Sequence, residues 1–341
     1  MEPSNRNSEI PVLLIYDLDR KHWGPFEINF TLDKIERLTN GLKDLGYPLT
    51  TLEIRDSHLE EVLLPYSPER FILFNLCEEL PGIPHNAGLV GEIIEKLGFT
   101  HTGSDPCILT FSQDKTGMKE LADGHGIPTP AWQSYNSLHQ NGWSRFPAIV
   151  KPSLEHCSVG IDTLAVVNNP NELSQRIDYV IQTFNQPALV EDFIDGREFR
   201  ISVIGNDNHT HMLPPVEIDY SSFDQDLEHL LTYDSKMNPE SRFFRDVKLN
   251  EHPELTSDEY QQLEMLALKI FHVLECRDYA GFDFRLKDGV FYLLDANPDP
   301  EFSHASSMVL GAAKEGLSYA GLAGYIIHEA ARRHPILKSM G

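Results

Sequence analysis

Positive charge is scarce in this sequence. Its 28 lysines and arginines face 52 aspartates and glutamates, which gives a formal net charge of -24 at pH 7. Nucleic acids and anionic membrane surfaces are bound through basic surfaces, so this balance argues against both as partners. Any phosphate group that the chain binds must be held by a few local lysines, by metal ions or by backbone N–H groups.

Cysteines and long apolar runs are scarce too. The four cysteines are scattered and form no Cys-x-x-Cys pair, a pattern typical of neither a zinc ribbon nor a disulfide framework. The first apolar run, at residues 12–16, is too short for the core of a signal peptide, and no later run could span a bilayer. We therefore expect an unprocessed protein of the cytoplasm.

The first hundred residues alternate short apolar runs with stretches of helical periodicity. With 341 residues, 41% of them hydrophobic, the chain can form two or three domains with buried cores. Alternating strands and helices predict a parallel sheet, and a change in composition predicts a domain boundary near residue 105. The predicted strands are residues 12–17, 48–54 and 70–79, and the predicted helices are residues 31–46, 56–66 and 86–98.

Residues 279–302 carry the pattern of a β-hairpin. Two apolar runs flank Lys-Asp-Gly, which supplies a turn with glycine where positive φ is needed. Asp283, Asp295 and Asn297 are spaced so that their side chains could share one face of the hairpin. Their oxygens are the ligands that Mg²⁺ prefers. The alternative is that the acidic segment is only a polar turn that closes a strand.

Three lysines lie in the next part of the chain. Lys115 and Lys119 are four residues apart and would share one face of a helix, where the alternative is a solvated lysine pair. Lys151 ends a buried strand, and the small polar residues of the loop at 153–160 could wrap backbone N–H groups around phosphates. The loop lacks the glycine and lysine spacing of a P-loop.

Two glutamates flank an Asp195-Gly196 turn between two predicted strands. Carboxylates such as Glu191 and Glu198 can accept hydrogen bonds from an adenine amino group and from ribose hydroxyls. The alternative is that both are solvated carboxylates that flank a hairpin.

The order of these motifs resembles that of a known superfamily. Between about residue 72 and residue 333 the chain reads, in order, Asp-Lys115, FPAIVKPSLEHCSVG, LVEDFIDGREF, YDSK, GFDFRL, LLDANPDP and GLSYAGLAGYIIHEAARR. This order resembles the ATP-grasp superfamily, and within it the D-alanine:D-alanine ligase-like group. The resemblance implies an α/β and α+β architecture, an ATP-grasp fold preceded by a Rossmann-like domain. The implied domains are residues 1–105 (N-terminal α/β domain), 106–190 (small central lobe) and 191–341 (large C-terminal lobe).

The resemblance also implies roles for particular residues. The implied nucleotide contacts are Lys115, Lys151, Glu191, Phe193, Ile194, Glu198 and Lys236. The implied metal ligands are Asp283, Asp295 and Asn297, which would hold two Mg²⁺ ions, with Mn²⁺ as a substitute. The implied catalytic residues are Lys236, Arg285 and Ser158. The implied substrate contacts are Glu155, His156, Cys157, Glu301 and Ser307.

The activity that follows from the resemblance is an ATP-dependent, ADP-forming ligase that joins a carboxylate to an amine through an acyl phosphate. Residues 153–160 and 220–255 are the expected lids, and a homodimer through the N-terminal domain is expected by analogy. Arg242 and Arg245 in the second lid would touch an anionic ligand or, alternatively, balance neighbouring acids on a surface strand. Two other functions stay open, a nucleotide-binding pseudoenzyme or regulatory module and a D-alanine:D-alanine ligase of cell-wall synthesis.

Several positions depart from the family pattern. Gly281 replaces the arginine that stabilises the oxyanion, and Arg285 on the same strand is a candidate replacement. Cys157 and Met237 replace polar residues associated with D-alanine, and Glu301 would repel a carboxylate on the second substrate. We therefore expect a different substrate pair, with an amine that carries positive charge or lacks a nearby carboxylate. The loop at residues 21–23 is a candidate specificity element.

Overall fold

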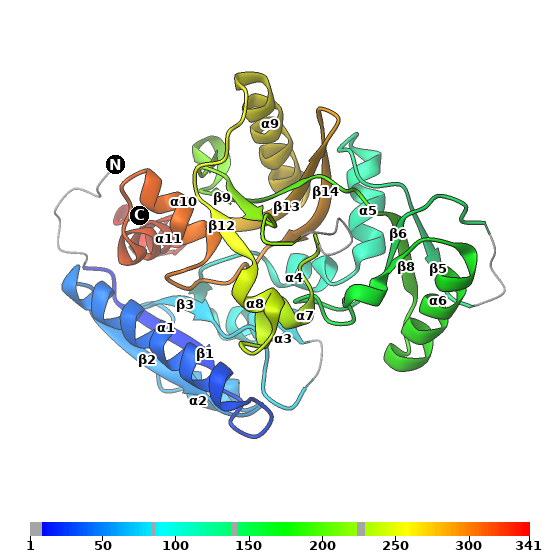
Figure 1. Cartoon of the computed structure of the whole chain (residues 1–341). Coiled ribbons are helices and arrows are strands. Elements are labelled where there is room, and N and C mark those ends of the chain that lie inside the picture. The colour runs from blue at the N-terminus through cyan, green and yellow to red at the C-terminus, as the bar shows by residue number, and fades with distance from the viewer. Residues whose placement is uncertain (1–8, 84–85, 138–141, 224–228) are drawn as a thin grey trace.

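Three β-sheets organise the computed structural model of the chain, in which residues 9–83, 86–137, 142–223 and 229–341 are described (Figure 1). One sheet belongs to the N-terminal part, one to the middle and one to the C-terminal part. Parallel and antiparallel sheets thus occur together, which confirms the predicted mixed α/β and α+β class. In the described part of the chain, no helix has the length and hydrophobicity needed to cross a bilayer.

The first sheet has the parallel strand order β2-β1-β3-β4, as the alternation of strands and helices predicts. The helix α1 starts with Pro25 and a Glu27 side chain that accepts from the Gly24 N–H, and it buries Leu38 and Leu42 against the sheet. The elements are β1 (Val12–Asp17), α1 (Pro25–Asp44), β2 (Leu49–Ile54), α2 (Leu59–Leu63), β3 (Ile72–Leu76), α3 (Ala87–Lys96) and β4 (Thr100–His101).

The second sheet is antiparallel, with the order β5-β8-β6-β7, and the helix α6 covers it (Figure 1). Its apolar residues form a separate core around Val150 and Val190. The elements of this part are α4 (Pro106–Ser112), α5 (Lys115–Gly124), β5 (Trp132–Tyr135), β6 (Ala148–Pro152), β7 (Val166–Val167), α6 (Pro170–Phe184) and β8 (Ala188–Asp192).

The third sheet has the order β12-β11-β9-β13-β14, and β10 also pairs with β9. The predicted hairpin is confirmed as β13 and β14, whose turn places Asp288 and Gly289 at positive φ. The elements are β9 (Arg197–Ile204), β10 (His211–Met212), β11 (Val216–Asp219), α7 (Tyr233–Met237), α8 (Arg242–Asp246), β12 (Lys248–Asn250), α9 (Ser257–Val273), β13 (Tyr279–Lys287), β14 (Val290–Asn297), α10 (Ser307–Lys314) and α11 (Tyr319–Ala331).

The strands on either side of the Asp195-Gly196 turn do not form a hairpin. β8 pairs within the second sheet as far as Asp192, and β9 pairs within the third. The alternative reading of Glu191 and Glu198 as solvated carboxylates of a hairpin is therefore wrong, because both side chains are buried. The turn is the link between the second and third sheets.

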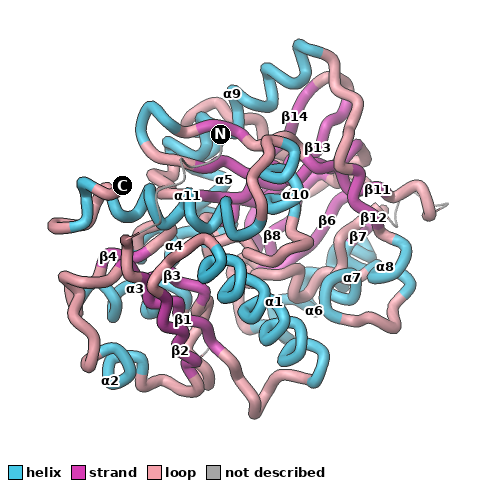
Figure 2. The backbone as a smooth tube through the Cα atoms, turned by 90° about the vertical axis from the view of Figure 1, so that its left-hand side faces the viewer, coloured by secondary structure: helices cyan, strands magenta, loops and turns pink. Residues whose placement is uncertain are grey.

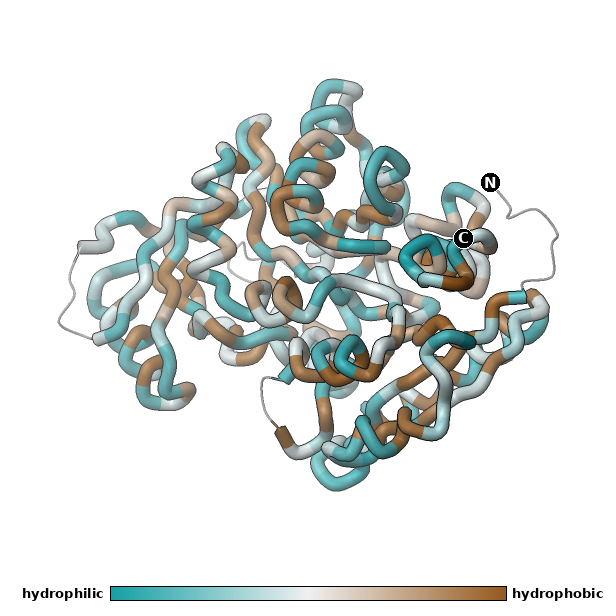
Figure 3. Tube along the Cα trace, turned by 180° about the vertical axis from the view of Figure 1, so that it is seen from behind, coloured by the Kyte–Doolittle hydropathy of each residue, from teal (hydrophilic) through white to brown (hydrophobic). Residues whose placement is uncertain are grey.

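The C-terminal helix α11 packs against α1, β3 and β4, and the helix α10 packs against β9 and β11 of the third sheet. The helix α11 contacts α1, and Figure 2 shows the two helices next to each other. One apolar core joins Leu14 and Phe74 of the first sheet to Phe302 and Ile326 of the C-terminal part. Figure 3 shows hydrophobic (brown) and hydrophilic (teal) residues alternating along the helical turns of the chain. The first sheet and the third are therefore held in a common structure by burial of apolar surface.

A fully buried carboxylate, Asp278, adds a polar link between the same parts. It accepts hydrogen bonds from the Gly103 N–H at 2.9 Å, from Asn206 Nδ2 at 2.8 Å and from Arg333 at 2.5 and 2.8 Å. These donors come from the end of the N-terminal domain, from the segment after β9 and from the segment after α11. Removal of the charge would leave a partly buried guanidinium without its partner.

Asp278→Asn is therefore expected to lower the free energy of unfolding by about 3 to 5 kcal/mol. Urea denaturation followed by circular dichroism measures this loss. Asp33→Asn, which breaks an exposed pair with Arg37, is the control and should leave the urea midpoint near that of the wild type. Equal midpoints for all three proteins would contradict the role assigned to Asp278.

Candidate active site

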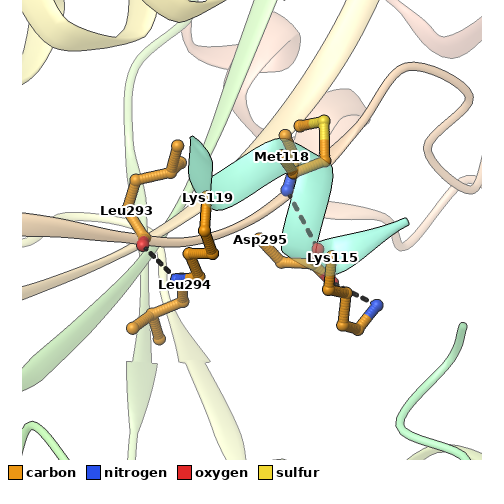
Figure 4. Close-up of a pocket in the computed structure, with 7 residues that line it drawn as sticks. Lys115, Met118, Lys119, Leu293, Leu294 and Asp295 are labelled. Atoms are coloured by element: carbon orange, nitrogen blue, oxygen red, sulfur yellow. Dashed lines mark hydrogen bonds and ion pairs between the residues drawn. The ribbon is translucent and has the colours of Figure 1, made fainter. Parts of the chain in front are cut away.

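The start of α5 places two lysines against the third sheet. The Asp114 carboxylate caps the helix by accepting from the N–H groups of Thr116 and Gly117, which makes Lys115 the first helical residue. Lys119 lies one turn later and donates to the Leu293 carbonyl of β14 at 3.0 Å (Figure 4). Both lysines are buried, so the alternative of a solvated pair is wrong.

A buried carboxylate holds two of the lysines in place. Glu191 on β8 forms two ion pairs, with Lys119 Nζ 2.8 Å from its Oε1 and Lys151 Nζ 2.7 Å from its Oε2. Burial raises the pKa of the Glu191 carboxyl, but the two ammonium groups outweigh it and hold the pKa below its ordinary value. α5, β6 and β8 are thus fixed to each other and, through the Leu293 carbonyl, to β14.

The hairpin presents two carboxylates in register. Asp283 lies directly opposite Asp295, and Asn297 lies opposite Gly281, so all three side chains that could bind a metal share one face as predicted. Lys115 Nζ lies 3.7 Å from Asp295 Oδ2. Burial raises the pKa of the Asp295 carboxyl, but Lys115 and the other cations nearby hold it below its ordinary value. The carboxylate is therefore ionised and available to a cation at neutral pH.

The side chains present fit both an anionic phosphate chain and a hard cation. The buried ammonium of Lys115 makes no hydrogen bond among the described residues, and an unpaired buried donor is costly unless a ligand accepts from it. In the described ranges, no three His, Cys, Asp or Glu side chains gather around one point. Asp283, Asp295 and Asn297 instead match Mg²⁺, which is commonly held by one or two carboxylates and by phosphate oxygens.

The loop at residues 153–160 closes over this region from the second sheet. The Ser153 carbonyl accepts from the Lys115 N–H at 3.0 Å, and His156 is near enough to Asp295 to help lower its pKa. Glu155 accepts from Gln186 at 2.7 Å. Cys157 and Ser158, neither of which is glycine, both have positive φ, a conformation that is costly and that clusters at ligand sites.

Arg285 does not face the hairpin carboxylates. Its guanidinium donates to Glu198 Oε2 at 2.9 and 2.6 Å and to the Ile194 carbonyl at 2.7 Å, and it lies 5.0 Å from the centre of the Phe193 ring. Tyr220 donates to the same Glu198 oxygen at 3.0 Å. The structure thus brings the predicted adenine and ribose contacts together. Arg285 lies among them and gives its donors to Glu198 and to backbone carbonyls, so this geometry does not support the predicted catalytic role of Arg285.

The remaining predicted residues lie in several places. Glu301 is exposed just after the hairpin, and Ser307 is the first residue of α10. Lys236 lies in α7, but its side chain is outside the described part of the structure. Arg242 and Arg245 donate to the Ser222 and Glu240 carbonyls of the same segment. Both arginines lie on the helix α8, so the alternative of a surface strand is wrong.

Two cations of the site were not predicted from the sequence. The sequence pattern predicts Lys119 only as a neighbour of Lys115 on one helix face, and it predicts no role for Arg200 on β9. Arg200 lies in register with Asp283, with its Nε 3.9 Å from Asp283 Oδ1. Its position two residues after Glu198 on the same strand was the available signal, because alternate residues of a strand share a face.

Comparison with known proteins decides the family. Residues 125–328, more than half of the chain, match the family model described as D-ala D-ala ligase C-terminus. The chain belongs to the D-alanine–D-alanine ligase family. Members of this family are ATP-dependent, ADP-forming ligases that use Mg²⁺, so the predicted enzyme class is confirmed.

Individual relatives of the ligase support the same assignment. It is 31% identical over 269 residues to an uncharacterized protein, y4sG, of Sinorhizobium fredii, covering 77% of the ligase and 75% of that protein. It is 29% identical over 306 residues to a D-alanine–D-alanine ligase of Aquifex aeolicus, covering 88% and 96%. A crystal structure of D-alanine–D-alanine ligase from Bacillus anthracis complexed with ATP superposes with a TM-score of 0.73 at 19% identity, covering 97% of this chain and 100% of that one. This last likeness shows the shared fold.

Replacement of one hairpin carboxylate tests the predicted metal set. Asp283→Asn removes a ligand charge without a change in shape, so the Mg²⁺-dependent gain in ADP affinity should fall by on the order of 100-fold. Isothermal calorimetry with and without Mg²⁺ measures this gain. The matched control is Asp288→Asn in the turn of the same hairpin, where asparagine tolerates the positive φ. An Asp283→Asn protein that keeps the full gain would place the metal elsewhere.

Proposed function

We propose that the ligase uses ATP and Mg²⁺ to activate a small carboxylate and joins it to an amine other than D-alanine. The use of ATP and Mg²⁺ is supported by two groups of opposite charge that face each other. Buried lysines of α5 and β6 lie on one side, and the carboxylates of the β13–β14 hairpin lie on the other. A nucleotide triphosphate with Mg²⁺ complements both sets at once.

The proposed reaction has two steps. A carboxylate oxygen of the first substrate attacks the γ-phosphorus of ATP, the bond between that phosphorus and the β,γ-bridging oxygen breaks, and ADP leaves. The nitrogen of the amine then attacks the carbonyl carbon of the acyl phosphate and gives up a proton, and phosphate leaves as the amide forms. Water must be excluded because it would hydrolyse the acyl phosphate.

The residues of the chain divide this work between them. Lys115 and Lys151 would bind phosphate oxygens, and Asp283, Asp295 and Asn297 would hold Mg²⁺. The loop at 153–160 and the segment of α7 and α8 would cover the reacting groups. A contact between them supports this, since the Tyr233 N–H at the start of α7 donates to the Ile161 carbonyl at 3.1 Å.

The local shape around position 281 supports a substrate other than D-alanine. A Cβ atom at Gly281 would lie 3.1 Å from Pro300 Cβ, so Pro300 would have to shift by a few tenths of an ångström to admit an arginine there. Cys157 is exposed in the loop where the family commonly has serine, and Glu301 is exposed beyond the hairpin. An exposed carboxylate at this edge disfavours an amine that carries its own carboxylate.

Buried acids near Glu301 support an amine with additional positive charge. Burial and the neighbouring Glu78 raise the pKa of Asp17 to about 7, and the same two causes raise the pKa of Asp299 to about 7. Burial and, to a smaller extent, the nearby Glu301 raise the pKa of Glu78. A cationic group bound beside these carboxyls would favour their ionised forms.

A cavity of about 300 Å³ adjoins this acidic region. Its walls include Asp17, Asp19 and Glu79, with His22 and Trp23 from the loop that was predicted as a specificity element. Acidic walls with the indole ring of Trp23 are suited to an ammonium or guanidinium group.

The second candidate is a D-alanine–D-alanine ligase. The observation that favours it is the name of several relatives, including the one of Aquifex aeolicus, which aligns over 96% of its own length. Phosphate release from ATP and Mg²⁺ in the presence of D-alanine alone distinguishes the two candidates.

The proposed function is tested by phosphate release across pools of D- and L-amino acids, β-amino acids and polyamines, with mass spectrometry of each active pool. We expect release that depends on two components and a product at their summed mass minus water. The carboxylate component should support slow release by itself. Release with D-alanine alone at the highest rate would establish the second candidate. ATP binding without release in any pool would favour a nucleotide-binding pseudoenzyme.

The raised pKa of Asp17 predicts a pH-dependent stability. Its carboxyl holds a proton more tightly in the folded chain than at the ordinary value of 3.8, so folding loses stability as the pH rises from about 4 to about 7. Asp17→Asn should remove this loss and stabilise the protein at pH 8 by up to about 4 kcal/mol relative to pH 4. Urea denaturation at the two pH values measures the difference. If Asp17→Asn changed the free energy of unfolding by the same amount at pH 4 and at pH 8, the raised pKa of Asp17 would be contradicted.

A further inference from the structure

One rung of the third sheet lacks a side chain at the point where the hairpin meets β9. Gly281 lies between Ser202 of β9 and Asn297 of β14 in the strand register. All three positions face the same side as Asp283 and Asp295. Position 281 therefore supplies no positive charge next to the carboxylates, and Ser202 across from it supplies none.

The adjacent rung does contain a cation. Arg200 of β9 lies directly opposite Asp283, and its Nε is 3.9 Å from Asp283 Oδ1. This is the outer limit of an ion pair, and within the described ranges it is the only ion pair or hydrogen bond of the Arg200 side chain. The side chain is 28% exposed, so its guanidinium is open to a ligand that enters over the sheet.

The other arginine on this face is occupied. Arg285, in register with Glu198, gives its donors to that carboxylate and to backbone carbonyls. On the opposite edge, Lys115 lies 3.7 Å from Asp295. The charges across the sheet therefore run as cation, carboxylate, carboxylate, cation, from Lys115 through Asp295 and Asp283 to Arg200.

The geometry points to Arg200 as a further catalytic residue, whose guanidinium contacts the oxygens of the transferring phosphoryl group from the side opposite Lys115. This role rests on the proposed function, because it requires a nucleotide phosphate over Asp283 and Asp295. The bond that forms joins the substrate oxygen to phosphorus and the bond that breaks frees ADP, while Arg200 exchanges no proton. The guanidinium has a fixed fork of donors that matches phosphoryl oxygens in two places at once.

The phosphoryl group spreads its charge over its equatorial oxygens as it transfers, so a cation in this position acts mainly on the transition state. The test uses ADP and Mg²⁺ with and without aluminium fluoride, which occupies the place of the transferring group. Calorimetry on the full-length protein gives the gain in ADP affinity that aluminium fluoride causes. We expect Arg200→Gln to lower this gain by on the order of 100-fold while ADP and Mg²⁺ alone bind within about threefold of the wild type.

Two further variants serve as controls. Arg200→Lys keeps the charge without the fork and should show an intermediate loss. Arg197→Gln removes an arginine from the same strand, where it pairs with Glu217 on the other face, and should leave the gain unchanged. Thermal unfolding shows whether each variant is folded. If Arg200→Gln is misfolded, the loss of gain measured for Arg200→Lys decides the test.

The outcomes separate this inference from the proposed function. A wild-type protein that fails to bind ADP with Mg²⁺ would overturn both. A wild-type gain that Arg200→Gln retains in full would overturn the role of Arg200 and leave the ligase function in place. If Arg200→Gln lowered the affinity for ADP and Mg²⁺ alone by the same factor, the catalytic role of Arg200 would also be overturned, since Arg200 would then act on ground-state binding. A wild type that binds ADP but gains nothing from aluminium fluoride would overturn it as well.

Discussion

Glu191 is a buried carboxylate on which the arrangement of the site depends. An isolated ion pair of this kind is costly, because each group loses its hydration, and removal of one partner leaves an uncompensated charge. Here one carboxylate forms ion pairs with two lysines that come from different elements, α5 and β6. The lysines are thereby held at a fixed distance from the hairpin, with one of them also bonded to the Leu293 carbonyl. A set of cations that would repel each other is thus kept in one place.

The same arrangement shows how a protein with a net charge of -24 can bind a polyanion. The positive charge is concentrated in a few buried side chains, where the low dielectric strengthens each interaction. The carboxylates opposite them are suited to a divalent metal, which adds positive charge only when it is bound together with the nucleotide.

Much of this site could be predicted from local sequence patterns. The turn glycine and the alternation of the two strands predicted the hairpin and the shared face of its carboxylates. The helical spacing of Lys115 and Lys119 and the end of an apolar strand predicted the elements on which Lys115 and Lys151 lie, and motif order predicted the family. The burial of Lys119 and the pairing of Arg200 with Asp283 could not be predicted in this way, because each depends on which strand of another segment lies beside it. The pairing of β8 and β9 in separate sheets was missed for the same reason, since a short turn between two strands usually indicates a hairpin. The domain limits at 105 and 190 and the homodimer stay predictions.

The central claim is that a metal and a nucleotide phosphate lie between the lysines of the central lobe and the carboxylates of the hairpin. The most direct measurement is an anomalous difference map from crystals grown with ADP and Mn²⁺, which replaces Mg²⁺ and has a strong anomalous signal. The account predicts a peak within coordination distance of Asp283 and Asp295, with the ADP phosphates beside Lys115 and Lys151. A peak bound elsewhere, or a nucleotide whose phosphates lie away from these lysines, would contradict it.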